Sequence, residues 1–596
     1  MTRDRLWPAV LIGWGVASIL LTLVAASSIA NLWLPDGDDA MRLLEVRDWL
    51  AGQSWWDVSQ HRLWGGAFAM HWSRIVDLPL GGIMLALDPI VGQAASTRAA
   101  LVAVPLLILV VVMALATRLT AMLAGVERAR FALLLVAMSP PIVHQMRPMR
   151  IDHHGWQVML ALGAVVALLS RPSWRSGTAV GLCLAALVSV SLEGMPMTAA
   201  IFGVALLAWA HDPARRTQAL AMTGTLIAGV VLLHAATRGP AMFAPACDAI
   251  APAWIAALGL ATAVAAATVL LAPAAATRRA LVTRVGGIAA AAVAGAVTLR
   301  LVAPLCTRGP FATLDPLVYT VWYRNVSEGM PIWEQQLGTA ITAYATPLVG
   351  LAGMIVARQA SAGTARIRWL ILLAIAAAAF VFSLLIVRGQ ATANVLAIPG
   401  VAWLLLGWLR GARRIGPVLP RTAATAAALL AATPWLPGLA LVPARSQADP
   451  TENLPRVAQR GLASCTEGRE VSDLRALPAG TVFAPLELSP PLLVATPHRA
   501  VASGYHRNTA AIHRVLATFM ASPAEAERLV RASGADYVAV CPGENEVAIY
   551  KRLAPDGFWA RLERGERFDW LQPIALPGSP VLAWRVRHLP REARRQ

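Results

Sequence analysis

The sequence predicts a polytopic α-helical membrane protein that carries a C-terminal α/β domain outside the membrane. Of its 596 residues, 57% are hydrophobic and only 14% are charged, whereas charged residues make up about 25% of a typical soluble domain. Apolar runs recur along the chain at about the 20-residue length that crosses a bilayer. After about residue 443 these runs stop, and charged and turn-forming residues become frequent.

The first apolar run covers about residues 7–27 and follows Arg3 and Arg5. It is too long for a cleaved signal peptide and lacks a small-residue cleavage site, so we expect a retained span with a cytoplasmic N-terminus. A long, Trp-rich outer loop follows at 28–97. Together with this first run, we expect about thirteen spans. The others lie near residues 98–118, 129–146, 156–170, 177–192, 196–210, 218–236, 253–273, 285–303, 338–357, 368–387, 391–409 and 418–442.

Basic residues gather in short connections that all fall on one side of the predicted membrane. Because Lys and Arg mark cytoplasmic loops, this side is the cytoplasm, and the odd number of spans places the C-terminus outside. The outer side carries the first loop, the turn near residue 150 and an acidic loop at 304–337, which we expect to be mobile. The net charge of +18 therefore reflects topology. No basic stretch with interleaved aromatic residues predicts a nucleic-acid partner.

The predicted domains are a transmembrane domain at 1–442 and an extracytoplasmic α/β domain at 443–596. In the second, short apolar runs such as Thr481–Leu486 and Tyr537–Cys541 predict strands. A helical pattern covers Pro523–Ala532, where Ser522 is a favourable N-cap and proline occupies the first helical position. The basic tail at Arg585–Arg595 is interpreted as a solvated end.

Five cysteines are present and none forms a C-x-x-C metal pair. Cys183 lies in an apolar run and is interpreted as inert core. Cys247 and Cys306 fall on the outer side, and Cys465 and Cys541 fall in the C-terminal domain, so either pair could form a disulfide in an oxidising compartment. Spacing alone leaves both pairings open.

Asp152, His153 and His154 stand side by side in R-I-D-H-H-G-W, between two apolar runs. A carboxylate and imidazoles near hydrocarbon are costly unless something compensates them. A divalent metal ion would do so, since aspartate oxygen and histidine nitrogen are both good ligands. An ordinary polar turn at a helix end is the alternative.

Further polar clusters lie on the same outer side: D-G-D-D at Asp36–Asp39, His71 before Trp72, Asn325–Glu328, Arg388, and the lower-weight Glu193 in S-L-E-G-M-P. Each has a structural explanation. Aspartates cap helices, a loop glutamate is solvated, and a terminal arginine snorkels to the interface. Together they favour a metal-assisted reaction on a lipid-linked phosphate, in which an arginine pairs with phosphate oxygens.

The order of these motifs resembles the catalytic subunit of oligosaccharyltransferases, in the GT-C superfamily of polyprenyl-dependent glycosyltransferases, over essentially the whole chain. The family's first-loop motif places an aspartate before a helix that ends in R-D-x-x-A-G. This sequence has G-D-D-A-M-R-L-L-E-V-R-D-W-L-A-G at Gly37–Gly52, which puts the catalytic aspartate on Asp38. The acceptor-reading motif W-W-D-Y-G is absent from residues 443–596, where Trp570 and Gly504–His506 are the nearest candidates.

The remaining matches assign roles to other residues. The archaeal D-x-H metal motif matches Asp152 and His154, and the family's first-loop histidine before tryptophan resembles His71. The S-V-S-E motif of the mobile loop matches N-V-S-E, which puts its glutamate on Glu328. The phosphate-contacting arginine of the family corresponds to Arg388.

The resemblance implies inverting, metal-dependent transfer of a sugar or oligosaccharide from a polyprenyl (di)phosphate donor to an acceptor at the outer membrane face. Mg²⁺ or Mn²⁺ is expected at Asp38, Asp152, His154 and His71, with His153 as a further candidate. Asp38 and Glu328 would activate the acceptor, which is a glycan, a lipid or a protein. Glu193 is a lower-weight candidate for contact with acceptor or metal.

Two other functions are compatible with the sequence. A transporter or flippase of lipid-linked saccharide would explain the many spans, although transporters usually place polar groups at the bilayer midplane in interrupted helices. A catalytically inactive scaffold of the same fold would lack metal affinity. The Arg- and Ala-rich composition is typical of a bacterial source, so we expect a multi-pass protein of the inner (cytoplasmic) membrane with a periplasmic C-terminal domain.

Overall fold

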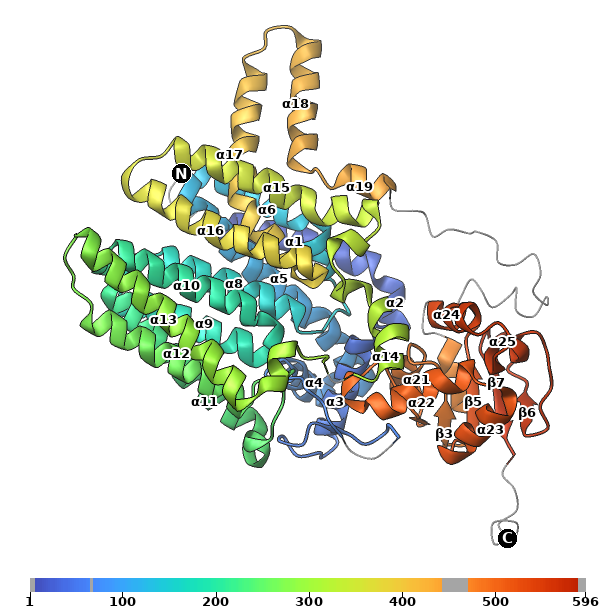
Figure 1. Cartoon of the computed structure of the whole chain (residues 1–596). Helices are drawn as coiled ribbons and strands as arrows, with labels where there is room; N and C mark the ends of the chain where they lie inside the picture. Colours follow the sequence, from blue (N-terminus) through green and yellow to red (C-terminus); the bar gives the residue numbers. More distant parts are fainter. Residues whose placement is uncertain (1–5, 65–67, 313, 442–469, 588–596) are drawn as a thin grey trace. The chain divides into compact units, whose positions relative to one another are not determined.

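The computed structural model describes residues 6–64, 68–312, 314–441 and 470–587. The chain divides into two compact units, each built from several segments (Figure 1). The first unit comprises residues 1–25, 72–312 and 327–443, and the second comprises 26–71, 313–326 and 444–596.

The first unit is an all-helical bundle, and helices occupy each of the expected spans, although the spans expected at 129–146 and 418–442 are each divided between two helices. Within the described residues, nine helical segments are long and apolar enough to cross a membrane, and α8, α9 and α18 are shorter apolar helices. The span expected at 129–146 is divided between α6 and the short α7. The number of spans therefore stays a prediction. The helices are α1 (Leu6–Val24), α4 (Asp77–Val91), α5 (Gln93–Ala124), α6 (Val126–Ala137), α7 (Pro140–His144), α8 (His154–Leu169), α9 (Trp174–Val190), α10 (Met195–His211), α11 (Arg216–Arg238), α12 (Pro252–Leu271), α13 (Arg278–Val302), α15 (Leu337–Gln359), α16 (Gly363–Leu385), α17 (Gln390–Arg413), α18 (Val418–Ala432) and α19 (Leu436–Leu441).

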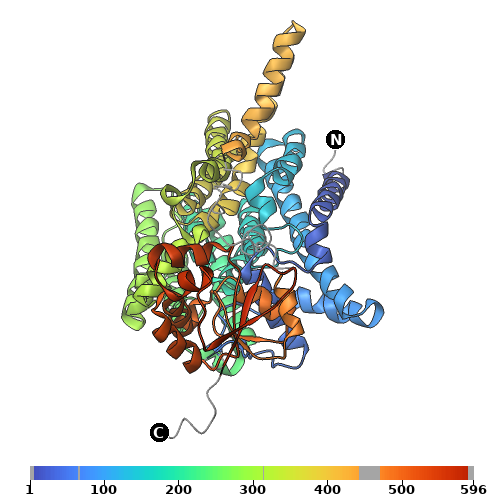
Figure 2. The ribbon, with the colours of Figure 1, turned by 90° about the vertical axis from the view of Figure 1, so that its right-hand side faces the viewer.

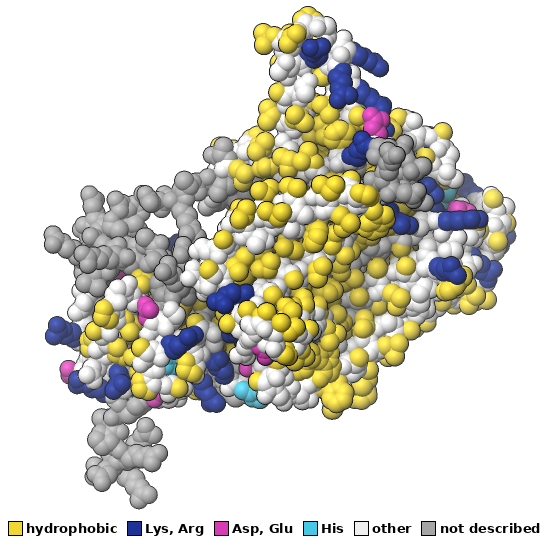
Figure 3. All heavy atoms as spheres, turned by 180° about the vertical axis from the view of Figure 1, so that it is seen from behind, with side chains coloured by type: hydrophobic (Ala, Val, Ile, Leu, Met, Phe, Trp, Pro, Cys, Tyr) yellow, Lys and Arg dark blue, Asp and Glu magenta, His cyan; other side chains and the backbone are white. Residues whose placement is uncertain are grey.

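The outer surface of this bundle is apolar. On α1, Ile12 is 68% and Ile19 is 62% exposed, and on α13 Val293 is 60% and Leu301 is 76% exposed. Apolar side chains dominate the face of the helical unit that Figure 3 shows. Because a soluble monomer rarely exposes contiguous apolar patches of this extent, the surface is that of a membrane protein.

Glycines let two pairs of helices pack in backbone contact. On α15, a Cβ added to Gly353 would lie 2.1 Å from the carbonyl oxygen of Gly400 on α17. On α9, a Cβ added to Gly177 would lie 2.2 Å from the carbonyl oxygen of Gln218 on α11. Small residues permit such close approach between apolar helices. These two crossings matter because α9, α15 and α17 carry the turns of the candidate site at their ends.

The second unit is an α/β fold, which confirms the expected fold class. Its mixed five-stranded sheet has the order β4-β3-β5-β7-β6, with β3 parallel to β4 and β5, and β7 antiparallel to β5 and β6. Helices pack around the sheet (Figure 2). The elements are α2 (Ala26–Ala30), α3 (Gly37–Leu50), β1 (Ser59–Gln60), β2 (Phe68–Ala69), α14 (Pro316–Val321), β3 (Thr481–Phe483), α21 (Ser489–Ala495), β4 (Arg499–Ala500), α22 (Thr509–Met520), α23 (Pro523–Ala532), β5 (Tyr537–Val540), α24 (Asn545–Leu553), α25 (Phe558–Glu563), β6 (Leu571–Ile574) and β7 (Leu582–Val586).

Two loop segments, 26–71 and 313–326, are grouped with this unit, and the predicted domain boundary at residue 443 stays a prediction. The first-loop residue Trp64 donates its backbone N–H to the carbonyl of Ala500, and Ala500 donates to the carbonyl of Arg62, each at 3.0 Å. Val318 and Val321 of α14 are buried in the hydrophobic core of the unit. Backbone pairing at the β4 edge thus joins the first loop to the C-terminal sheet.

Of the two pairings that the sequence left open, the one on the outer side is formed. Cys247 and Cys306 are bonded, with their Cα atoms 4.9 Å apart. Cys541 is also disulfide-bonded, whereas Cys465 lies outside the described residues. Cys183 is a free thiol.

Candidate active site

The D-H-H turn connects α7 to α8 through a strained backbone. Met149 adopts a positive φ of 73°, a conformation that is costly for a residue with a long side chain and tends to cluster at functional sites. Its N–H donates to the carbonyl of Leu101 at 2.9 Å, which fixes the turn to α5. Asp152, His153 and His154, the last being the first residue of α8, are then only 2–3% exposed.

Asp152 and His154 are spaced as two ligands of one ion would be. Oδ2 of Asp152 lies 3.2 Å from Nε2 of His154, so both atoms could bind the same divalent ion. Among the described residues, Nε2 of His154 is buried and makes no hydrogen bond. Nδ1 of the same ring lies 3.1 Å from Oε1 of Gln157, one turn further along α8. An imidazole held through one nitrogen while the other faces a carboxylate is the usual arrangement of a metal ligand, so these residues fit a divalent ion.

His153 differs from His154 because both of its ring nitrogens have partners. Nδ1 lies 2.5 Å from Oδ1 of Asp152, and Nε2 lies 3.4 Å from Oε2 of Glu193. Burial alone would lower the pKa of His153, but the Asp152 carboxylate outweighs it and raises the pKa to about 9. Because each ring nitrogen of His153 already faces a carboxylate, the geometry favours His153 as the group that orients Asp152.

Three charged residues of the site occupy 3₁₀ turns that interrupt or precede apolar helices. Glu193 lies in Leu192–Gly194 between α9 and α10, and Arg388 lies in Val387–Gly389 between α16 and α17. Glu328 lies in Ser327–Gly329, before α15. The N–H of Val387 donates to the carbonyl of Met330 at 3.2 Å, which joins the turn of Arg388 to that of Glu328.

Arg388 pairs with two carboxylates at once. Its Nη1 lies 2.8 Å from Oε1 of Glu193, and its Nη2 lies 2.7 Å from Oε1 of Glu328. The Arg388 side chain is 20% exposed. A planar guanidinium that faces two oxygens through its two terminal nitrogens is also arranged to take two oxygens of one phosphate.

In the second unit, Asp38 lies in the first turn of α3. The side chain of Asp36 caps this helix by accepting a hydrogen bond from the N–H of Asp38 at 3.0 Å, as the capping interpretation of Asp36–Asp39 predicts. The next residue, Asp39, is completely buried. Asp38 is half-buried, and a carboxylate in the first turn of a helix is stabilised in its ionised form by the helix dipole.

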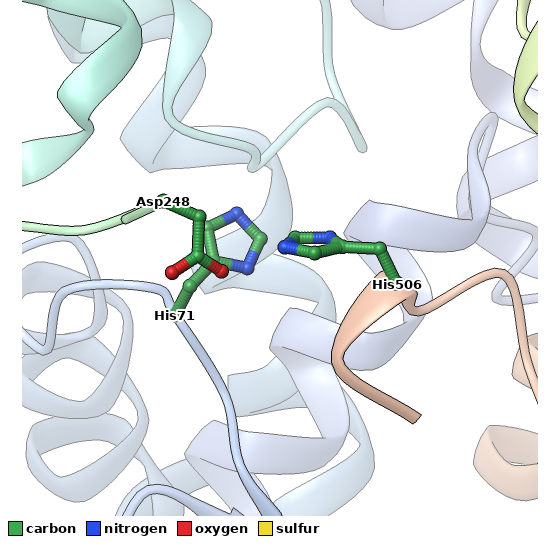
Figure 4. A group of neighbouring side chains, drawn as sticks. All are labelled: His71, Asp248 and His506. Atoms are coloured by element: carbon green, nitrogen blue, oxygen red, sulfur yellow. The ribbon is translucent and has the colours of Figure 1, made fainter. Parts of the chain in front are cut away.

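His71 lies at the end of the first-loop segment, beside Tyr505 and His506 of the same unit. Its Nδ1 is 2.6 Å from the phenolic oxygen of Tyr505, and its ring centroid is 5.0 Å from that of His506. Figure 4 shows these two imidazoles next to each other. Tyr505 thus holds His71 through one nitrogen, which is how protein groups orient the histidines of metal sites.

The structure brings together one part of the predicted site. Asp152, His153, His154, Glu193, Glu328 and Arg388 form a contiguous cluster within the first unit. Asp38 and His71 belong to the second unit, so a metal site that combines them with Asp152 and His154 stays a prediction. Sequence reasoning missed Gln157, whose position three residues after His154 on a helix is the signal that could have found it.

The first unit is a helical bundle whose charged turns gather Asp152, Glu193 and Arg388, and the second is an α/β unit. Neither a protein-family model nor a curated protein sequence matches the chain. Solved structures do match it, and they confirm the fold predicted from the sequence motifs.

The archaeal oligosaccharyltransferase AglB from Archaeoglobus fulgidus, in complex with an inhibitory peptide and a dolichol-phosphate, matches with a TM-score of 0.64 and 14% identity, over 99% of this chain and 76% of that one. The oligosaccharyltransferase of the same organism, tethered to an acceptor peptide containing the NVT sequon, matches with a TM-score of 0.55 and 14% identity, over 98% and 74%. Its complex with Zn and sulfate gives 0.53 and 13% identity, over 91% and 70%. At such identities the likeness establishes the fold alone.

Proposed function

We propose that this chain is a polyprenyl-dependent glycosyltransferase. It would transfer a sugar or oligosaccharide, with inversion, from a polyprenyl (di)phosphate donor to a glycan, lipid or protein acceptor. The observation that carries the proposal is the buried Asp152–His154 pair, joined through His153 and Glu193 to Arg388. The dolichol-phosphate bound to the archaeal structure supports a polyprenyl phosphate as the donor.

A divalent ion fits the Asp152–His154 pair, and the Zn complex of the archaeal oligosaccharyltransferase supports a metal in this fold. Mn²⁺ or Mg²⁺ suits a site that combines oxygen ligands with a phosphate. When bound, the ion supplies positive charge that stabilises the departing phosphate. Asp38 and His71 are proposed as further ligands.

The residues of this chain would act on both sides of the scissile bond. Arg388 holds the phosphate oxygens and stabilises the charge that they gain as the bond to the anomeric carbon breaks. Asp38 or Glu328 accepts the proton of the acceptor nucleophile as its new bond to that carbon forms on the opposite face. This direct displacement inverts the anomeric configuration. The proposed location is a bacterial inner membrane, with the second unit on the periplasmic side.

The test is turnover of a panel of radiolabelled polyprenyl-linked sugars by the purified full-length chain, with Mn²⁺ and with a chelator. We expect metal-dependent consumption of one donor, which Asp152→Ala abolishes. Asp556→Ala is the control, because this carboxylate is 95% exposed and belongs to the other unit. If no donor is consumed while lipid-linked saccharide still binds, a transporter or flippase replaces the enzyme.

A further inference from the structure

Glu193 occupies the centre of the cluster, and its two carboxylate oxygens face different groups. Oε1 lies 2.8 Å from Nη1 of Arg388, whereas Oε2 lies 3.4 Å from Nε2 of His153 and 3.9 Å from Nδ1 of His154. We propose that Glu193 is a positioning residue that couples binding of the metal ion at Asp152 and His154 to binding of phosphate at Arg388. This inference rests on the proposed function and adds a linkage between its two ligands.

The coupling has a continuous physical route. Asp152 contacts His153 through Oδ1 at 2.5 Å, His153 contacts Glu193, Glu193 contacts Arg388, and Arg388 contacts Glu328 at 2.7 Å. All of these residues belong to the first unit. The route begins at a proposed ligand of the ion and ends at the arginine proposed to hold the phosphate.

Phosphate competes with the Glu193 and Glu328 carboxylates for Arg388, and this competition determines whether the ion favours or opposes binding of phosphate. Each of the two terminal nitrogens of Arg388 already pairs with a carboxylate, so the negative charges of Glu193 and Glu328 oppose the binding of a phosphate at the same nitrogens. A divalent ion beside His154 attracts Oε2 of Glu193 and weakens the hold of this carboxylate on Arg388. The ion therefore makes Arg388 more accessible to phosphate, and by reciprocity phosphate tightens binding of the ion.

The side chain of Glu193 predicts an unusual mutational effect. In Glu193→Gln the carboxylate charge is lost while the shape stays similar, so phosphate no longer competes with an anion for Nη1 of Arg388. We expect the ion-free affinity for phosphate to rise about threefold to tenfold, and the further gain on adding the ion to shrink by a similar factor. A purely structural role for Glu193 would instead weaken binding of both ligands.

The experiment measures the Kd of undecaprenyl phosphate with and without Mn²⁺, and the Kd of Mn²⁺ with and without undecaprenyl phosphate. The full-length chain is held in nanodiscs. The variants are Glu193→Gln, Glu193→Asp, which keeps the charge but shortens the reach, and the control Glu127→Gln. Glu127 forms an equivalent ion pair with Arg410 at 2.5 Å, where both side chains are more than half exposed. We expect the control to match the wild type and Glu193→Asp to lose coupling, because its shorter side chain cannot reach both Arg388 and His153.

Two outcomes would overturn the inference in distinguishable ways. If the wild type binds both ligands but Glu193→Gln retains the wild-type coupling within about twofold, Glu193 does not couple them and the proposed function stands. If the wild type binds neither Mn²⁺ nor undecaprenyl phosphate, the proposed function fails and the coupling fails with it.

Discussion

At the scale of single residues, the two adjacent histidines have different environments. His154 directs an unbonded buried nitrogen at Asp152, whereas His153 uses both nitrogens to bridge two carboxylates. The D-x-H resemblance assigned the ligand role to His154, whereas it assigned no role to His153. Both rings lie near Asp152 and Glu193, but only His154, the first residue of α8, lies close to Gln157 through Nδ1.

The two histidines should therefore respond differently to removal. We expect His154→Ala to weaken Mn²⁺ binding more than about 100-fold because a ligand is lost, and His153→Ala to weaken it about tenfold because only orientation is lost. Electron paramagnetic resonance of Mn²⁺ titrated into the purified chain measures both. His211→Ala, at the exposed end of α10, is the control. An equal loss in both histidine variants would show that our assignment of the ligand is wrong.

The stability of the second unit should depend on pH, because this unit contains a buried carboxyl group. Burial and the neighbouring Glu487 raise the pKa of Glu546 from 4.5 to about 7. Between pH 4.5 and about 7, Glu546 is therefore protonated in the folded unit but ionised in the unfolded chain. The stability that this proton contributes is fully present below pH 4.5 and is lost as the pH rises through 7.

The melting temperature of the second unit should therefore fall as the pH rises through about 7. Glu546→Gln should flatten this dependence on pH, because the amide does not titrate. Asp556→Asn changes an exposed carboxylate and should leave this dependence intact. An unaltered pH profile in Glu546→Gln would mean that Glu546 is ionised throughout this range.

At the scale of elements, the site depends on helices that approach each other through glycine. The sequence predicted the spans from apolar length, and it predicted the site residues from their order on one face. It could not predict that Glu193 and Arg388, 195 positions apart, form an ion pair. That contact depends on how α9, α10, α16 and α17 pack, and apolar helix surfaces leave little pattern from which to deduce neighbours.

The crossing of α15 and α17 can be tested with one methyl group. Gly353→Ala would place a Cβ 2.1 Å from the carbonyl oxygen of Gly400, and we expect this overpacking to lower stability by about 1–3 kcal/mol. Gly407→Ala, also on α17, meets nothing within 4 Å and should stabilise the helix by up to about 1 kcal/mol. Thermal melting in detergent compares the two variants. Equal and small effects would argue against backbone contact at this crossing.

At the scale of the whole molecule, the second unit gathers three separate segments of the chain. Composition located the C-terminal part, because charged and turn residues replace apolar runs there. The contribution of the first loop had no such signal, since the bonds between Trp64, Ala500 and Arg62 are made by backbone groups. Every residue except proline can donate these bonds, and therefore no residue pattern marks them.

Arg62 is the side chain that secures this loop. Its guanidinium donates to the carbonyls of Leu493 at 2.8 Å and of Thr496 and His498, both at 2.6 Å. We expect Arg62→Ala to destabilise the second unit by about 3 kcal/mol, because carbonyls lose a charged donor. Hydrogen exchange across residues 470–587 measures the loss. Arg528→Ala removes an exposed pair with Glu525 and should change stability by less than about 0.5 kcal/mol. Similar protection in the two variants would contradict this role for Arg62.

The segmented make-up of the second unit imposes an order on its synthesis. Arg62 leaves the ribosome 431 residues before its partner Leu493, an interval of roughly 20 to 90 s at translation rates of about 5–20 residues per second. During this time the first-loop segment has no sheet edge to join, although the membrane helices that follow it are already being inserted. The second unit therefore completes its fold late. Until then, the first-loop backbone groups that later pair with Ala500 lack this partner, and they are available for incorrect pairing or for binding by a chaperone.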